Sequence, residues 1–98
     1  MIEAISIIEV YTVRGLANRL EAPLSALVSH LQNTAGSISY HAVQSPANSD
    51  LWVLTGQWES KKAMEDHYDH PALSGVMTLL GCNTVTRMSV SSFLKSNA

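Results

Sequence analysis

Residues 58–71 have the sequence WESKKAMEDHYDHP and join a predicted strand to a predicted helix. The strand runs from Leu51 to Trp58, and Ser60 just after it is typical of a helix N-cap. Pro71 disfavours helical geometry at the residue before it, so the helix is expected to end there. The side chains that helical spacing turns inward are Ala63, Met64, His67 and Tyr68. This stretch therefore predicts a strand followed at once by a helix that carries a histidine toward the core.

The N-terminal third predicts one strand and one longer helix. Residues 5–13 are rich in β-branched side chains and carry apolar residues at both parities, which is typical of a strand covered on both faces. A single apolar stripe indicates the helix, and it consists of Leu24, Leu27, Val28 and Leu31. Proline is tolerated only in the first turn of a helix, so Pro23 predicts a start between Asn18 and Ala22.

A hairpin is predicted in the middle of the chain. Gly36 follows the long helix, and residues 38–43 then alternate as a strand. The turn composition of residues 45–50 connects this strand to the one that begins at Leu51. The two strands are expected to pair with each other.

The C-terminal part predicts a second short helix and a last strand. Pro71 can open the helix and Gly81 can end it. Its apolar stripe consists of Leu73, Val76, Met77 and Leu80. The last strand is expected at about residues 84–93, which completes the order β α β β α β. That order predicts an α+β fold of the ferredoxin-like kind, in which one domain over residues 1–98 forms a four-stranded antiparallel sheet with its helices on one face.

Helices on one face leave the other face of such a sheet uncovered. The strands nevertheless carry apolar side chains on both faces, for example Ile5 and Ile7 against Ile8 and Val10. The composition agrees, since 46% of the residues are hydrophobic and 14% are charged in a chain of 98 residues. The second face is therefore expected to pack against a second copy, as a homodimer.

Charge and segment composition exclude several classes of partner. The net charge is −2, with no clustered basic stripe for phosphate contacts, so nucleic acid is not expected as a partner. No signal segment and no apolar run of membrane-spanning length occurs, so a cytoplasmic protein without membrane contact is expected. Cys82 is the single cysteine, which rules out an intrachain disulfide by count and favours a small packed side chain.

Several short motifs resemble one known family. They are Gly36–Tyr40 before the hairpin, Leu51–Leu54 and Trp58–Ser60 in and after the next strand, then Ala63, His67 and the pair His70 and Pro71. Together they make nearly the whole chain similar to the antibiotic biosynthesis monooxygenase domain family. The resemblance implies a dimeric α+β barrel. It also implies relatives that include cofactor-free oxygenases of quinols and anthrones, haem-degrading enzymes and proteins of unknown role.

The functional residues of the family carry over only in part. Anthrone oxygenases of this kind pair the strand-end tryptophan with an asparagine four residues earlier and a tyrosine six residues later. Here Trp58 is present, but those positions hold Leu54 and Met64. The haem-degrading pattern is also unmatched, since its positions correspond to Ile7, His67 and Met77. Haem is therefore not expected, and neither is a nucleotide cofactor, because no phosphate-binding loop or nucleotide fingerprint occurs.

His67 is the central candidate for chemistry. Its ordinary pKa lies near neutrality, so it could act as a general base. The alternative is a buried histidine that donates to a backbone carbonyl. A metal site made by His67 and His70 with Asp66 and Asp69 is not expected, because the aspartates face outward. His30 is interpreted as a solvated residue near a helix end, and His41 is left open between a pocket and the dimer contact.

The sequence therefore supports two hypotheses. The first is a cofactor-independent monooxygenase that acts on a small aromatic ligand, such as a quinol or an anthrone-like phenol, with His67 and Tyr68 as catalytic residues. Its substrate-binding residues would be Trp58, Tyr40, Met64 and Met77. Trp52 has the same strand parity as Trp58, so it could line the same apolar cavity. The second is a non-catalytic dimeric module that binds a small ligand or serves a stress response, which the apolar residues at Leu54 and Met64 favour.

Overall fold

The computed structural model describes residues 2–71, 73–74 and 85–95. In chain order, the elements are β1 (Ala4–Thr12), the 3₁₀ helix η1 (Ala17–Leu20), α1 (Glu21–Gln32), β2 (Ser37–Gln44), β3 (Leu51–Trp58), α2 (Lys61–Tyr68) and β4 (Val85–Leu94). Of the helices that these residues form, none is long and apolar enough to cross a membrane.

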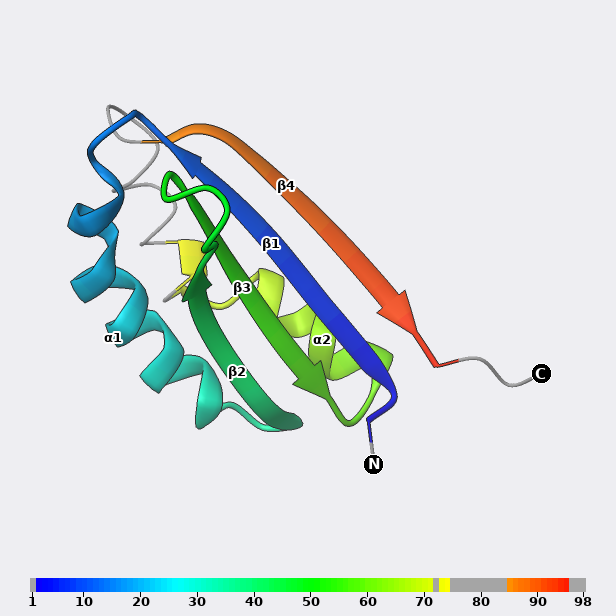
Figure 1. The fold of residues 1–98 in the computed structure, drawn as a ribbon. Coiled ribbons are helices and arrows are strands. Elements are labelled where there is room, and N and C mark those ends of the chain that lie inside the picture. The colour runs from blue at the N-terminus through cyan, green and yellow to red at the C-terminus, as the bar shows by residue number, and fades with distance from the viewer. Residues whose placement is uncertain (1, 72, 75–84, 96–98) are drawn as a thin grey trace.

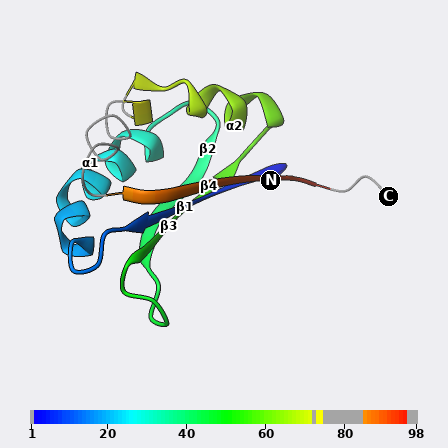
Figure 2. The ribbon, with the colours of Figure 1, turned by 90° about the horizontal axis from the view of Figure 1, so that it is seen from above.

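The strands form one four-stranded sheet in the order β2-β3-β1-β4, and every neighbouring pair is antiparallel. In Figure 1, β1 lies in the middle of the sheet between β3 and β4, although it comes first in the chain. Figure 2 shows α1 and α2 on the same side of the sheet, with the opposite side uncovered. The predicted ferredoxin-like α+β fold is confirmed.

The observed boundaries follow the predicted ones closely, and β3 matches its prediction at both ends. The start of the long helix differs in detail, because η1 precedes it and α1 begins at Glu21, which places Pro23 in the first turn. Residues 71, 73 and 74 are helical, as expected for a helix that opens at Pro71. The rest of that predicted helix, with Val76, Met77, Leu80 and Gly81, lies outside the described residues, and so does Cys82.

The core lies between the helices and one face of the sheet. In β1 and β3, alternate residues are buried, and Ile8, Val10 and Leu54 are among those that face the helices. From α1 the buried residues are Leu24, Leu27 and Leu31. The remaining core residues are Ala4, Ala17, Leu20, Tyr40, Trp52, Trp58, Met64 and Leu73. The residues of opposite parity, such as Ile5 and Ile7, lie on the face that carries no helix.

A glycine turn fixes the start of α2 against the rest of the fold. Gly36 has φ of +85°, a conformation that side chains with a Cβ disfavour. A Cβ at this position would also collide with the Cβ of Ala63 on α2. The carbonyl of Gly36 accepts the backbone N–H of Glu59 at 2.8 Å. The turn before β2 and the start of α2 therefore hold each other in place.

Candidate functional site

Helix α2 places the candidate residues because its first turn is firmly capped. Ser60 lies in an extended conformation, and its Oγ accepts the backbone N–H of Ala63 at 3.0 Å. The outward face carries an exposed ion pair between Lys62 and Asp66 at 2.9 Å. Seven residues after the cap, on the inward face, His67 is fully buried.

Three aromatic side chains surround the imidazole of His67. Its ring stacks on the indole of Trp58, with ring centroids 4.4 Å apart and planes inclined by 28°. The ring of Tyr68 lies 4.2 Å away and that of Tyr40 lies 5.9 Å away, measured between centroids. The structure therefore brings together four of the residues that the sequence indicated.

The protonation state of His67 follows from its contacts. Nδ1 lies against the backbone carbonyl of Met64, so it carries the proton and donates to that oxygen. Burial lowers the pKa of His67 and the nearby His70 adds to this effect, whereas the hydrogen bond to Met64 opposes it. The ring is thus neutral at neutral pH, and its Nε2 is an acceptor with no hydrogen-bond partner among the described residues.

Trp58 is held by a residue of the neighbouring strand. Its Nε1 donates to Ser6 Oγ at 3.0 Å, and both residues are fully buried. Gly56 lies directly opposite Ser6 in the register of β1 and β3. A Cβ on Gly56 would lie 2.7 Å from Trp58 Nε1 and 2.8 Å from Ser6 Oγ. Glycine therefore leaves the space in which the indole N–H and the hydroxyl meet.

Tyr40 and Met64 complete the buried layer around these rings. The ring of Tyr40 contacts Trp58 edge-on, with centroids 6.1 Å apart. Its hydroxyl is buried without a hydrogen-bond partner among the described residues, and burial raises the pKa of Tyr40 so that it stays protonated. Met64 is 3% exposed and belongs to the core. Tyr40 is thus a buried donor and His67 a buried acceptor in one layer.

An open pocket lies beside this layer, between α2 and the strands β1 and β4. Its volume is about 280 Å³, and its described lining is Ile8, Tyr68, Leu73, Ser74, Met88 and Val90. No charged residue occurs in that lining. The hydroxyl of Tyr68 is also 2.8 Å from Ser92 Oγ on β4. Tyr68 therefore links the buried layer to the pocket, since its ring contacts His67 and its side chain lines the opening.

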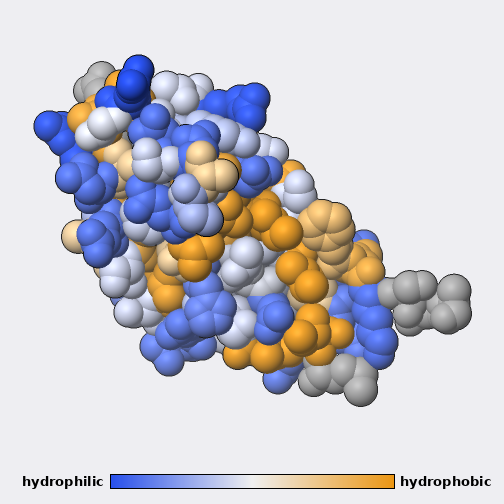
Figure 3. Space-filling view, in the orientation of Figure 1, coloured by the Kyte–Doolittle hydropathy of each residue, from blue (hydrophilic) through white to orange (hydrophobic). Residues whose placement is uncertain are grey.

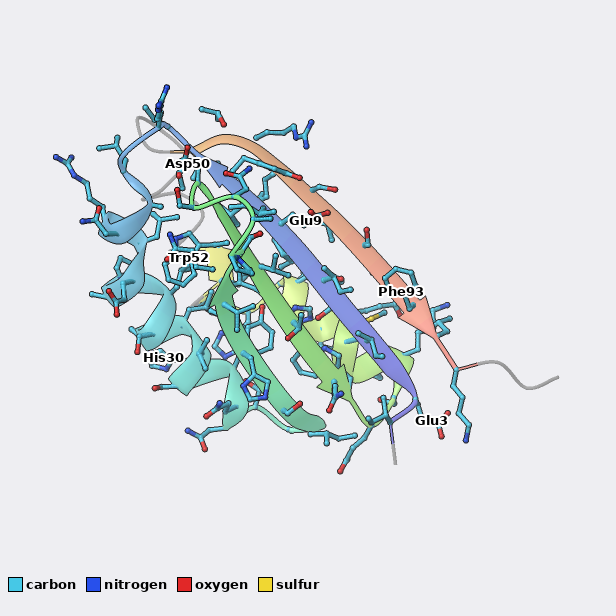
Figure 4. All side chains as sticks on the ribbon, viewed as in Figure 1. Glu3, Glu9, His30, Asp50, Trp52 and Phe93 are labelled. Carbon is cyan, nitrogen blue, oxygen red and sulfur yellow. The ribbon has the colours of Figure 1, made fainter. Side chains whose placement is uncertain are left out.

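Other sequence candidates lie apart from this site. Trp52 is buried at the far end of β3, where its Nε1 donates to the carbonyl of Ala17 at 2.9 Å. Figure 4 shows it on the α1 side of the sheet, and it lines a groove of about 370 Å³ that also contains His41. The two tryptophans share a face of β3 as predicted, but they lie at its opposite ends, and the described lining of the groove beside Trp52 does not include Trp58. His30 is exposed on α1, and Met77 lies outside the described residues.

A metal centre finds no support in the part of the chain that the structure describes. It contains no group of three or more histidine, cysteine, aspartate or glutamate side chains that could hold an ion. Asp66 and Asp69 are exposed, whereas His67 is buried.

Comparison with known families decides the classification. The model of the family described as antibiotic biosynthesis monooxygenase matches residues 4–77. The chain belongs to this family. The family is one of monooxygenases, and this gives the general class of the chain's function without its substrate. No curated protein sequence matches the chain.

Several solved structures share the fold of this chain. A Deinococcus radiodurans protein named after antibiotic biosynthesis monooxygenases is 18% identical with a TM-score of 0.87, and the match covers 97% of this chain and 94% of that one. A Pseudomonas aeruginosa protein is 21% identical with a TM-score of 0.83, over 98% and 96% of the two chains. A Mycobacterium tuberculosis protein is 22% identical with a TM-score of 0.78, over 97% of each chain. At these identities the likeness concerns the fold.

Sequence reasoning missed part of the site. Ser6 was not singled out, because one polar residue in a strand that is apolar on both faces gives no signal of its own. Ile8 and Val90 were likewise not assigned to a pocket, whereas Met88 is one of the methionines that the sequence offers as adaptable surface for an aromatic ligand. Ile8 pairs with Val90 and Val10 with Met88 across β1 and β4, so knowledge of this register would have been enough to find them.

Proposed function

We propose that this protein is a cofactor-independent monooxygenase that acts on a small, neutral aromatic such as a quinol or an anthrone-like phenol. What supports the proposal is the buried, neutral His67, whose Nε2 has no hydrogen-bond partner among the described residues. The His67 ring contacts Tyr68, at the edge of a pocket whose described lining carries no charged residue. Membership of the antibiotic biosynthesis monooxygenase family supplies the reaction type.

In the proposed reaction, the protein removes a proton from the bound substrate, and the electron-rich anion then reduces O₂ directly. His67 serves as the base or as an orienting group, and Tyr68 serves as a hydrogen-bond donor to the substrate. For an anthrone, one oxygen atom becomes the new carbonyl and the other leaves in water with the two methylene hydrogens. A substrate that covers apolar walls such as Ile8 and Val90 displaces water from them, and fewer waters around the anion strengthen the electrostatic contacts with it.

Oxygen uptake tests this proposal. The purified protein is incubated with a panel of quinols and anthrones, and the rate is compared with that of buffer alone. His67→Ala is expected to lower the rate by about 100-fold or more, which is the usual contribution of a general base. His30→Ala is the matched control because His30 is exposed on α1, and its rate should be unchanged. A wild-type rate equal to that of buffer for every compound would rule the activity out for that panel.

A second function, ligand binding without catalysis, is favoured by two apolar residues. They occupy positions at which known oxygenases of the family carry polar side chains. Leu54 is fully buried and Met64 is 3% exposed, so neither offers a polar atom to a ligand from its side chain. The corresponding proposal is a non-catalytic module that binds a small apolar ligand in the same pocket. Saturable binding of a quinol without any oxygen uptake would support the module and contradict the enzyme.

We also propose that the face without helices pairs with a second copy of the chain. Figure 3 shows hydrophobic side chains gathered on this face. Val43 is 52% exposed and Phe93 is 53% exposed, and both have the parity of this face, as do the half-buried Ile5 and Ile7. Apolar side chains gathered on an exposed sheet face are typical of an interaction surface.

Light scattering coupled to size-exclusion chromatography tests the dimer. The wild type is expected to elute with twice the mass of one chain, and Val43→Glu should shift it toward the monomer. Leu94→Glu is a control of equal charge, because Leu94 is 54% exposed but has the parity of the helix-covered face. A wild-type monomer at micromolar concentration would contradict the dimer without affecting the proposed reaction.

A further inference from the structure

Ser6 is a buried hydroxyl in the middle of the candidate site. It is fully buried on β1, on the face that otherwise presents mainly apolar residues to the helices. A buried hydroxyl costs free energy unless it is hydrogen-bonded, and a buried indole N–H likewise needs an acceptor. The 3.0 Å bond from Trp58 Nε1 to Ser6 Oγ satisfies both groups.

The space around this bond is closed on the side of β3. A Cβ on Gly56 would approach Trp58 Nε1 to 2.7 Å, Ser6 Oγ to 2.8 Å and Tyr40 Cδ2 to 2.9 Å. These distances are shorter than van der Waals contact allows, so the indole, the hydroxyl and the Tyr40 ring leave no room for a methyl group at this position. The indole edge is therefore fixed by Ser6, and its plane is confined by the neighbours of Gly56.

The orientation of the indole in turn limits the orientation of His67. The imidazole rests face to face on Trp58, inclined by 28°, while its Nδ1 is held by the carbonyl of Met64. One contact acts on the face of the ring and the other on its edge, so together they leave a single orientation. The direction of the Nε2 lone pair follows from these two contacts.

We propose that Ser6 is a positioning residue for His67 and acts through the indole of Trp58. Loss of the Ser6 hydroxyl leaves the buried Trp58 N–H without its acceptor, so the indole is expected to rotate and the stack to loosen. Water then reaches the imidazole more easily. The claim about geometry stands by itself, and only its consequence for turnover rests on the proposed function.

Ring-nitrogen NMR over a pH series tests this inference in wild type and Ser6→Ala. In the wild type, the proton of His67 should stay on Nδ1 at neutral pH. In Ser6→Ala, the titration midpoint of His67 should rise by about half a pH unit or more as the ring gains solvent. Exchange of the Trp58 indole N–H should also become about tenfold faster or more.

A matched control separates positioning from general destabilisation. Leu27→Ala removes core volume from α1, which carries neither Trp58 nor His67, so it should lower the melting temperature and leave the His67 midpoint in place. An equal midpoint in Ser6→Ala and Leu27→Ala would overturn the proposal. If Ser6→Ala does not fold, Ser6→Cys gives the same readout, since a thiol of similar size is only a weak acceptor.

Oxygen uptake is recorded as a separate arm, so that the two proposals can fail independently. A shifted midpoint in a protein that consumes no oxygen would support the positioning role and contradict the proposed reaction. If the protein consumes oxygen but the His67 midpoint in Ser6→Ala equals that of the wild type, the proposed reaction is supported and the positioning role is contradicted. A lower kcat with an unchanged KM in Ser6→Ala, together with the shifted midpoint, would support both.

Discussion

The two ends of β3 both bury a tryptophan under the helices, but they satisfy the indole N–H differently. Trp52 donates to the backbone carbonyl of Ala17 at 2.9 Å, whereas Trp58 donates to the side chain of Ser6 at 3.0 Å. A backbone acceptor is present whatever residue occupies the position, while a side-chain acceptor depends on one residue type. The Trp52 end is therefore secured by the fold itself, and the Trp58 end by particular side chains.

The two tryptophans also differ in the polar atoms that surround them. Trp52 borders an open groove in which the polar side chains, such as Ser25 and His41, are exposed to solvent. Trp58 contacts His67 and Tyr40, and each of these keeps a buried polar atom without a partner among the described residues. Unsatisfied buried polar atoms cost stability and are found at functional sites. The unpartnered polar atoms therefore favour the Trp58 end of β3, and not the Trp52 end, as the place of the proposed site.

The largest effect is expected from removing the tryptophans themselves. Trp58 is fully buried, so Trp58→Ala should lower the free energy of unfolding by about 3–5 kcal/mol. Trp52→Ala should cost less, because Trp52 is 9% exposed and borders an open groove. Urea denaturation of both variants measures the difference. A greater loss of unfolding free energy in Trp52→Ala than in Trp58→Ala would contradict this expected order.

Two glycines allow a smaller comparison. Gly56→Ala pushes a methyl group into Trp58, Ser6 and Tyr40, and should cost about 1–3 kcal/mol through overpacking. Gly15 has φ of +84° and open space around it, so Gly15→Ala should cost about 1 kcal/mol from backbone strain alone. Thermal melts followed by circular dichroism compare them. In addition, only Gly56→Ala should change the exchange rate of the Trp58 indole N–H.

Acidification should loosen the Trp58 end first. The pKa of His67 is lowered in the folded state, so the unfolded chain binds its proton at higher pH than the folded chain does. The neutral His67 therefore contributes to the free energy of folding fully above the ordinary histidine pKa of about 6.5. This contribution is lost as the pH falls below about 6.5 toward the lower pKa of the folded state. Urea denaturation over a pH series should show less acid sensitivity in His67→Phe. His30→Ala, as the exposed control, should retain the full sensitivity.

The smallest effect is expected from hydroxyls near the surface. Tyr68→Phe removes the bond to Ser92 and should cost about 0.5 kcal/mol, because the hydrogen bond is partly open to water. Tyr11→Phe is its counterpart on the face without helices, where the hydroxyl donates to Glu9 at 3.2 Å. Both losses should be similar in denaturation experiments. Quinol binding should weaken only in Tyr68→Phe, and equal binding in both variants would remove Tyr68 from the proposed pocket.

The sequence predicted the elements well because each one carries a local signal. Ser60 provides the cap that starts α2, and the hairpin between β2 and β3 has clear turn residues. The 3₁₀ start before α1 was not foreseen, since residues 17–20 contain no cap that marks a change of helix type. The grouping of Trp58, His67 and Tyr68 also followed from the sequence, because a short connection joins β3 to α2.

The sequence by itself determined the alternation that puts Trp52 and Trp58 on one face and the helical spacing that turns His67 inward. These follow from periods of two and 3.6 residues, which depend only on local backbone geometry. The tertiary structure alone decided that Ser6 meets Trp58 and that Tyr68 meets Ser92. Those contacts join residues 52 and 24 positions apart. The pairing register of β1 with β3 brings Ser6 to Trp58, and the packing of α2 on the sheet brings Tyr68 to Ser92.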